Sequence, residues 1–302
     1  MAIPNVIVIG DRINPEGFKK TRALLEAEDF GGLQELAVRQ VQSGAQYLDM
    51  TIGPRGYKDA AFLTEVIRSL QAAVDVPLCF DYPSAPVQET CLKAYDPAKA
   101  RGRRPLVNSL AETRMDVLDL LKIQPFQLVL MASERLEDGA VKPNKRMEEV
   151  VDLTKRMTSL LRREYHFDLS DVFVDVTIQS LSSDTDGQIR MALDSIRAIG
   201  QDPDLQGIHI VGGITNIGNM LPPLKFDGVP LRLLFENAFL TVAVPLGFDC
   251  IMGTPWNNFQ FLPDDNVVLE TFRDFIELKG LDAMRRLRKL WARPPASAVA
   301  AV

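Results

Sequence analysis

The chain has 302 residues, of which 46% are hydrophobic and 25% are charged, so it has an ordinary globular composition and enough length for a large core. Its formal net charge of -6 argues against nucleic acid or an anionic membrane as a partner. No secretory signal pattern and no bilayer-length apolar run are present, so we expect a cytoplasmic protein without a membrane segment. The three cysteines and two histidines show no metal-ligand spacing, so no metal site is expected.

Apolar runs of strand length alternate along the chain with amphipathic segments of helix length. The apolar runs predict strands at residues 6–10, 47–52, 77–81, 105–108, 126–131, 172–175, 208–211 and 249–252. The periodic segments predict helices at residues 33–42, 60–73, 86–95, 115–121, 145–165, 188–199, 231–244 and 267–278. This alternation is typical of an α/β fold of the TIM (β/α)8 barrel type, and no GxGxxG fingerprint favours an open sheet. We expect a single barrel domain over residues 1–290 and a flexible tail over residues 291–302.

The stretch from residue 208 to residue 219, IHIVGGITNIGN, carries a signal for a binding site. Its β-branched run favours a core strand, and Gly212 and Gly213 allow a backbone or a flat ligand to come close. Asn216 and Asn219 follow the strand and offer hydrogen-bond donors and acceptors without charge. Such a site suits a neutral, polar, flat ligand.

Other predicted strands also end on a polar side chain. In a barrel these ends converge on one mouth, which would bring together Asp49, Asp81, Asn108, Asp175 and Asn216. Each of these residues also has a structural interpretation. A strand-end Asp can cap the next helix or pair with an arginine, and Gly53-Pro54 after Asp49 fits a simple Asx turn. Asparagines at strand ends also form turns.

Four further features have structural interpretations. His209 is expected to be a hydrogen-bonded, buried core residue, and His166 lies at the end of a predicted helix, where it can interact with the helix dipole. The cysteines are expected to be bystanders, because nothing marks a thiolate-stabilising site. The basic segment from Arg101 to Arg104 is interpreted as a solvated loop.

The motifs taken together resemble the pterin-binding methyltransferases, barrel enzymes that exchange a methyl group between tetrahydrofolate and a corrinoid. The matching segments run in order through residues 9–14, 48–54, 78–81, 106–109, 173–175, 212–216, 237–240 and 246–249. Each motif is short, but the ordered set is fairly specific. The resemblance covers the chain from about residue 6 to residue 250 and implies a dihydropteroate synthase-like fold with a pterin held in the barrel.

The resemblance also implies roles for particular residues. Asp81, Asn108 and Asp175 would hydrogen-bond the pterin ring, and the carboxylates suit its amino-amidine donors. Asn216 would be the catalytic residue that reaches N5, with Asn219 as a second candidate. Asp49 completes the candidate pterin-binding set. Tetrahydrofolate or 5-methyltetrahydrofolate would be the substrate, cobalamin would be carried by a partner corrinoid protein, and the enzyme would be a homodimer.

Some segments depart from the pattern of the relatives that act in acetogenesis. The third strand is followed by Tyr82-Pro-Ser84 where those relatives have Ser, and Thr215-Asn-Ile-Gly218 replaces Ser-Asn-Val-Ser. The segments at residues 95–104 and 221–229 also look longer. These departures favour formation of methyltetrahydrofolate in a demethylation pathway.

Two alternatives stay open. Dihydropteroate synthase is the first, although no late Ser-Arg-Lys or Arg-Val-His segment is present. A non-catalytic folate-binding subunit of a corrinoid complex is the second, and Asn216 argues against it.

Overall fold

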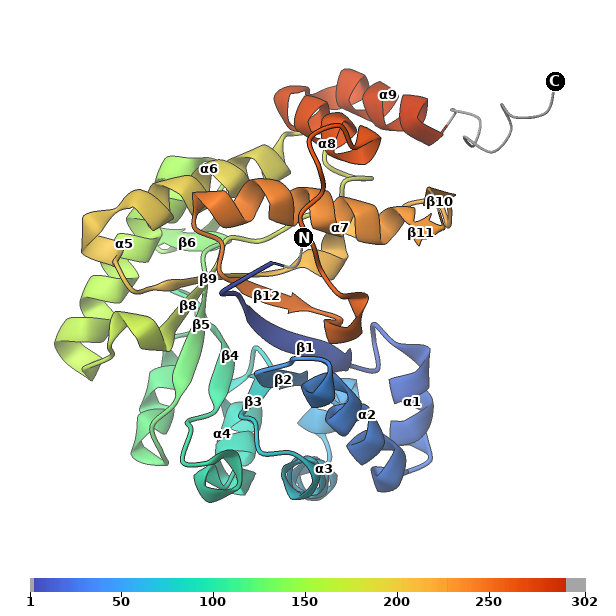
Figure 1. Ribbon diagram of the computed structural model, residues 1–302. Helices are drawn as coiled ribbons and strands as arrows, with labels where there is room; N and C mark the ends of the chain where they lie inside the picture. Colours follow the sequence, from blue (N-terminus) through green and yellow to red (C-terminus); the bar gives the residue numbers. More distant parts are fainter. Residues whose placement is uncertain (1–2, 227, 292–302) are drawn as a thin grey trace.

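The computed structural model describes residues 3–226 and 228–291, and its central strands close into one barrel (Figure 1). All neighbouring barrel strands are parallel, and they follow one another in chain order until the last strand pairs with the first. The barrel strands are β1 (Ile7–Ile13), β2 (Tyr47–Met50), β3 (Leu78–Asp81), β4 (Leu106–Leu110), β5 (Gln127–Met131), β8 (Val172–Asp175), β9 (His209–Gly213) and β12 (Cys250–Gly253). The predicted TIM barrel is therefore confirmed.

Helices surround the barrel and cover its outer face (Figure 1). They are α1 (Lys19–Glu26), α2 (Phe30–Gln42), α3 (Ala60–Ala73), α4 (Ala85–Ala94), α5 (Met147–Tyr165), α6 (Gln188–Gln201), α7 (Leu231–Ala243), α8 (Val267–Glu277) and α9 (Gly280–Trp291). In α3, Asp59 caps the helix by accepting a hydrogen bond from the Phe62 amide, and Leu63, Val66 and Ile67 are buried against the sheet. No helix within the described ranges is both long and apolar enough to cross a bilayer.

Several predicted element boundaries were wrong. β1 continues to Ile13 instead of ending at Gly10, because Ile13 still pairs with Met50 across a register shift. β4 continues past Asn108 to Leu110. The segment predicted as a helix after β4 is the 3₁₀ helix η3 (Met115–Lys122). Local patterns alone do not reveal where pairing with a neighbouring strand prolongs a strand.

Some elements were not predicted. α1 lies between β1 and α2, and two hairpins leave the barrel: β6 (Glu134–Glu137) with β7 (Ala140–Pro143), and β10 (Lys225–Phe226) with β11 (Val229–Pro230). α9 packs on α8 and buries Leu287 and Leu290, although its sequence is rich in arginine. The predicted tail at residues 291–302 lies outside the described residues apart from Trp291, which ends α9, so that boundary stays a prediction.

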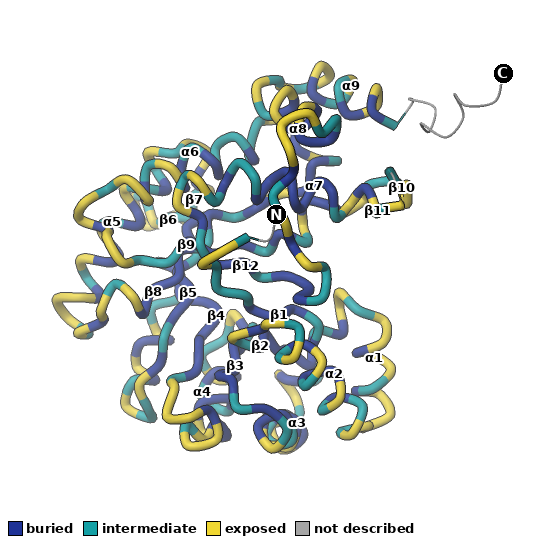
Figure 2. Tube along the Cα trace, viewed as in Figure 1, coloured by how far each residue is buried: buried dark blue, intermediate teal, exposed yellow. Residues whose placement is uncertain are grey.

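The barrel strands run mostly through buried residues (Figure 2), and the barrel interior has an apolar middle layer. The middle layer consists of Ile9, Cys79, Leu106, Val129, Phe173, Val211 and Cys250. Cys79 and Cys250 are core residues, as expected, and burial raises the pKa of both thiols, so they stay neutral. Because strand side chains alternate, the next inward positions of β3, β4 and β8 bring Asp81, Asn108 and Asp175 to the carboxyl end.

The polar groups at the amino end of the barrel have protein partners. His209 Nδ1 lies 2.7 Å from Asp249 Oδ2, which confirms the expected hydrogen bond, whereas the expected full burial is wrong because the His209 side chain is half-buried. Asp171 is buried and bonds to the Arg104 guanidinium, with 2.8 Å between Arg104 Nη1 and Asp171 Oδ2. The solvated-loop interpretation is therefore wrong for Arg104. It holds for Arg101, whose side chain is 72% exposed beside Asp75.

Replacing Arg104 by methionine is expected to lower the free energy of unfolding by about 2–3 kcal/mol, measured by urea denaturation at pH 7.5. The change leaves the buried Asp171 carboxylate without its charged partner, and half-exposure of Arg104 keeps the loss below that of a fully buried pair. Arg101→Met is the matched control and should change the free energy by less than about 0.5 kcal/mol. Equal losses in the two variants would contradict a special role for Arg104.

Candidate functional site

Three of the predicted site residues lie together at the carboxyl end of the barrel. Asp81 of β3 and Asn108 of β4 are partners in the strand register, and Asp175 ends β8 on the other side of β5. All three residues occupy the carboxyl ends of their strands, and the charge of Asp81 contributes to raising the pKa of Asp175. The convergence expected from the barrel is confirmed for these residues.

Asp49 lies deeper than the other carboxyl groups, because β2 pairs Asp49 with Cys79, two residues before Asp81. Its side chain is only 2% exposed, and its Oδ1 atom has no hydrogen-bond partner among the described residues. Burial, and then the charge of Asp81, raise the pKa of Asp49 well above its usual value. Asp49 thus lies below the mouth, and its Oδ1 atom is a buried acceptor without a partner among the described residues. The Asx-turn interpretation does not account for this position.

The carboxyl groups above Asp49 also have raised pKa values. Burial raises the pKa of Asp81 to about 6, with a contribution from Glu16. Burial also raises the pKa of Asp175 to about 6, although the Thr177 amide donates a 2.7 Å hydrogen bond to its Oδ1. Acids that are crowded without a cation among them suit a ligand that brings N–H donors. Within the described residues, no group of three or more His, Cys, Asp or Glu side chains is arranged to hold a metal ion.

Three residues that support this site were not predicted. Gln88 of α4 is buried, and its amide nitrogen lies 2.7 Å from the Phe80 carbonyl, 3.0 Å from that of Tyr82 and 3.1 Å from that of Asn108. The Tyr82 hydroxyl accepts a 2.6 Å hydrogen bond from the Ile52 amide. These contacts join the ends of β2, β3 and β4, and no local sequence pattern indicates them.

Asp11 is the third unpredicted residue. It falls outside the strand predicted at residues 6–10, but it lies inside the prolonged β1 and is buried. Thr254 Oγ1 donates to its Oδ1 at 3.2 Å, and burial raises its pKa. Asp11 therefore adds another carboxyl group on the β1 side of the mouth.

Asn216 and Asn219 belong to the turn that follows β9. Asn216 lies in the 3₁₀ helix η6 (Ile214–Gly218), and Asn219 caps its carboxyl end. Both are exposed, and Asn219 Nδ2 donates to Asn216 Oδ1 at 3.2 Å. The Asn216 amide folds back over Gly213, where a Cβ would lie 3.1 Å from its Nδ2 atom. The two amides are thus placed at the mouth, free to meet a ligand.

The interpretation of Gly212 was wrong. A Cβ at Gly212 would lie 2.3 Å from Cδ1 of Ile178, so this glycine makes room for a core side chain and not for a ligand. Near Gly213 the structure places only the side chain of Asn216, so the close approach of a ligand there stays a prediction.

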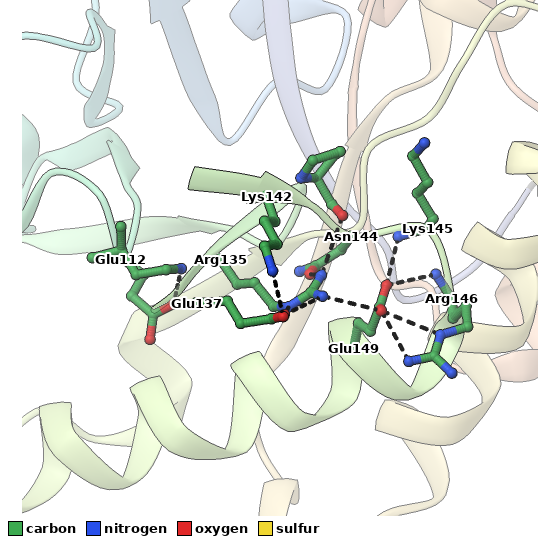
Figure 3. Close-up of polar contacts among 10 residues, drawn as sticks. Glu112, Arg135, Glu137, Lys142, Asn144, Lys145, Arg146 and Glu149 are labelled. Carbon is green, nitrogen blue, oxygen red and sulfur yellow. Dashed lines mark hydrogen bonds and ion pairs between the residues drawn. The ribbon is translucent and has the colours of Figure 1, made fainter. Parts of the chain in front are cut away.

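The β6–β7 hairpin lies between β5 and α5 in the chain, and polar contacts join it to α5 (Figure 3). Arg135 bonds to Glu137 and lies 3.3 Å from Glu149 of α5. Glu112, in the segment after β4, accepts a hydrogen bond from the Leu136 amide at 2.7 Å and bonds to Arg156 of α5 at 2.7 Å. These contacts fix the hairpin to its neighbours on both sides.

The fold and the site place the chain in a known family. Residues 10–252 match the family model described as "Pterin binding enzyme", which covers most of the chain, so the protein belongs to this family.

Among curated relatives, the chain is 28% identical over 258 residues to the methylcorrinoid:tetrahydrofolate methyltransferase of Eubacterium limosum, covering 83% of this chain and 85% of the relative. It is 23% identical over 256 residues to the methionine synthase of Mycobacterium leprae, covering 82% of this chain but only 20% of that longer protein.

Solved structures of dihydropteroate synthases share the fold. The Coxiella burnetii enzyme in complex with pteroic acid has a TM-score of 0.58 and 16% identity, covering 86% of this chain and 91% of that one. The Burkholderia cenocepacia enzyme has a TM-score of 0.56 and 18% identity, covering 96% of this chain and 93% of that one. At these identities the likeness supports the barrel and carries no argument about the reaction.

Proposed function

We propose that the protein is a methyltransferase that moves a methyl group between N5 of tetrahydrofolate and the cobalt of a corrinoid held by a partner protein. The observation that carries the proposal is the set of crowded carboxyl groups at the mouth, with Asp49 below them, in a chain similar over most of its length to a methylcorrinoid:tetrahydrofolate methyltransferase. The departures in the third and seventh strands favour methyltetrahydrofolate as the product. A cytoplasmic homodimer stays a prediction from composition and family resemblance.

The residues at the mouth fit a pterin. Its amino-amidine edge presents several N–H donors in one plane, and carboxylates accept such donors in pairs. Asp81 and Asp175 would take these donors, and Asn108 would contact a neighbouring ring position. Asp49 below them has the free acceptor that a ligand or a bound water can satisfy.

Asn216 would act at the reacting nitrogen. The corrinoid supplies the chemistry of the methyl–cobalt bond, and this chain binds and aligns the pterin. The lone pair of N5 must be free before N5 takes up the methyl group. Once N5 carries the methyl group, it loses its proton. A neutral amide can accept from the N5–H group or donate to the N5 lone pair, so Asn216 serves both states without adding a charge. Alignment of two large reactants supplies much of the remaining rate.

A turnover assay tests this function. The protein is mixed with tetrahydrofolate and methylcobalamin, and the decay of the methylcobalamin spectrum is compared with the formation of 5-methyltetrahydrofolate measured by mass spectrometry. Loss of methylcobalamin together with formation of 5-methyltetrahydrofolate supports the proposal. A parallel reaction with 6-hydroxymethyl-7,8-dihydropterin pyrophosphate and p-aminobenzoate tests the synthase alternative. Product in that reaction alone would overturn the methyltransferase assignment, and tetrahydrofolate binding without either product would favour a non-catalytic subunit.

A further inference from the structure

Gln88 is a polar residue of α4 that reaches from the outer layer to the ends of β3 and β4. Its side chain is fully buried, which is uncommon for glutamine. Its Nε2 atom lies 2.7 Å from the Phe80 carbonyl, 3.0 Å from that of Tyr82 and 3.1 Å from that of Asn108. The first two of these carbonyls flank Asp81 in the chain. Gln88 therefore holds the backbone on both sides of one proposed pterin-binding residue and holds a second one directly.

Tyr82 holds the same strand ends through other contacts. Its backbone N–H donates to the Asn108 carbonyl at 2.9 Å, which continues the pairing of β3 with β4 one residue beyond Asp81. Its buried hydroxyl accepts a 2.6 Å hydrogen bond from the Ile52 amide, just past the end of β2. Its ring packs over Gly56, where a Cβ would lie 2.5 Å from the tyrosine oxygen. Tyr82 therefore ties the end of β3 to the strands on both sides.

The Gln88 amide contributes geometry more than stability. Its two N–H groups are shared among three carbonyls, and those of Phe80 and Asn108 also accept the Tyr82 N–H, at 3.2 and 2.9 Å. Its Oε1 atom is buried without a hydrogen-bond partner among the described residues, which offsets part of what the donors gain. What the amide fixes is the position of the strand ends.

That position matters for a flat ligand. Asp81 and Asn108 are partners in the strand register, so a shift of either strand end changes how their side chains meet one ring edge. Binding groups need to be held within about 0.5 Å of the productive geometry, and supporting hydrogen bonds provide this. Asp175 ends β8, beyond β5, and none of the contacts of Gln88 or Tyr82 reaches it.

We propose that Gln88 and Tyr82 are positioning residues of the pterin site, which align Asp81 with Asn108 and thereby set the affinity for the ring. Neither residue contacts the pterin in this assignment. The assignment rests on the proposed function and adds residues behind the mouth to those that determine binding.

Gln88→Met tests the role of the amide, because methionine fills a similar volume and removes the unpaired oxygen together with the donors. The variant is expected to bind tetrahydrofolate about 10-fold more weakly by calorimetry. Its rate constant for methyl transfer at saturation should change by less than about 3-fold, because none of these contacts reaches η6 and Asn216.

Double variants separate positioning from a general structural effect. In the Asp81→Asn background, Gln88→Met should cost only about 3-fold in affinity, because part of what Gln88 aligns has already been lost. In the Asp175→Asn background it should still cost about 10-fold, since Asp175 lies outside the contacts of Gln88. The same loss in both backgrounds would overturn the positioning role.

Gln124→Met is the matched control. The Gln124 amide also donates to two backbone carbonyls, those of Leu92 and Tyr95, and its Oε1 atom is likewise buried without a partner among the described residues. It precedes the amino end of β5, away from the mouth. Gln124→Met should therefore lower the free energy of unfolding in urea about as much as Gln88→Met and leave tetrahydrofolate affinity unchanged.

Tyr82→Phe is a second, independent variant that keeps the ring and removes only the hydroxyl. It is expected to weaken tetrahydrofolate binding by about 3-fold, again with little change in the rate constant at saturation. Wild-type affinity in both Gln88→Met and Tyr82→Phe would overturn the inference and leave the proposed function standing. Failure of the wild type itself to bind tetrahydrofolate would overturn the proposed function, and the inference with it.

Discussion

Replacing Asn216 by alanine is expected to lower the rate constant for methyl transfer by about 100- to 1,000-fold while changing the dissociation constant of tetrahydrofolate by less than about tenfold. The pterin ring would still be held by Asp81, Asn108 and Asp175. In the proposed mechanism, the lost amide would contact N5, whose proton and lone pair change during the reaction. Single-turnover rates with methylcobalamin and calorimetric binding constants measure the two effects separately.

Asn219→Ala is the control for a general disturbance of η6. Asn219 supports the Asn216 amide through one 3.2 Å hydrogen bond, so its loss should cost much less than the loss of Asn216 itself. Equal losses of rate and affinity in Asn216→Ala would show that Asn216 only binds substrate.

Replacing Asp81 or Asp175 by asparagine is expected to weaken tetrahydrofolate binding by at least about 10- to 100-fold, because each change removes a charge-assisted pair of acceptors at the same size. Asp138→Asn, at the exposed tip of the β6–β7 hairpin, is the matched control and should bind normally. Normal binding by both site variants would place the pterin elsewhere.

The same carboxyl groups make both the stability of the protein and its pterin affinity depend on pH. The pKa values of Asp81 and Asp175 are raised from 3.8 to about 6, so folding favours their neutral forms. Their contribution to stability in the free protein is present below about pH 4 and is lost as the pH rises through about 6. Each Asn variant should therefore unfold at a higher temperature than wild type at pH 7.5. In the proposed site the pterin donors bind ionised carboxylates, so wild-type affinity should fall as the pH drops below about 6.

Much of the fold could be predicted because its elements are encoded locally. Strand β8 and helix α3 have the predicted bounds, since an isolated apolar run and a clear helical period mark them. Asp81 and Asp175 were found for a related reason. A carboxylate that ends an apolar run is unusual, and the barrel topology then brings such ends together.

The remaining features depend on contacts between distant segments. The polar residues Asp11 and Arg12 fall outside the strand predicted at residues 6–10, and only the pairing of β1 with β2 shows that they belong to β1. Gln88 looks like any surface residue of an amphipathic helix until the ends of β3 and β4 are placed against it. The role of Arg104 likewise depends on Asp171, 67 residues further along the chain.

The two polar ends of the barrel interior differ in one respect. At the amino end, Asp171 and Asp249 have partners from the protein, whereas at the carboxyl end Asp49 has an oxygen without one among the described residues. Substitutions at the amino end would mainly change how stable the fold is. Substitutions at the carboxyl end would change both what the folded chain binds and, because burial of Asp81 and Asp175 costs stability at neutral pH, how stable it is. A gain in binding at the carboxyl end is therefore coupled to a loss of stability, which compensating substitutions at the amino end, beyond the apolar layer, can offset.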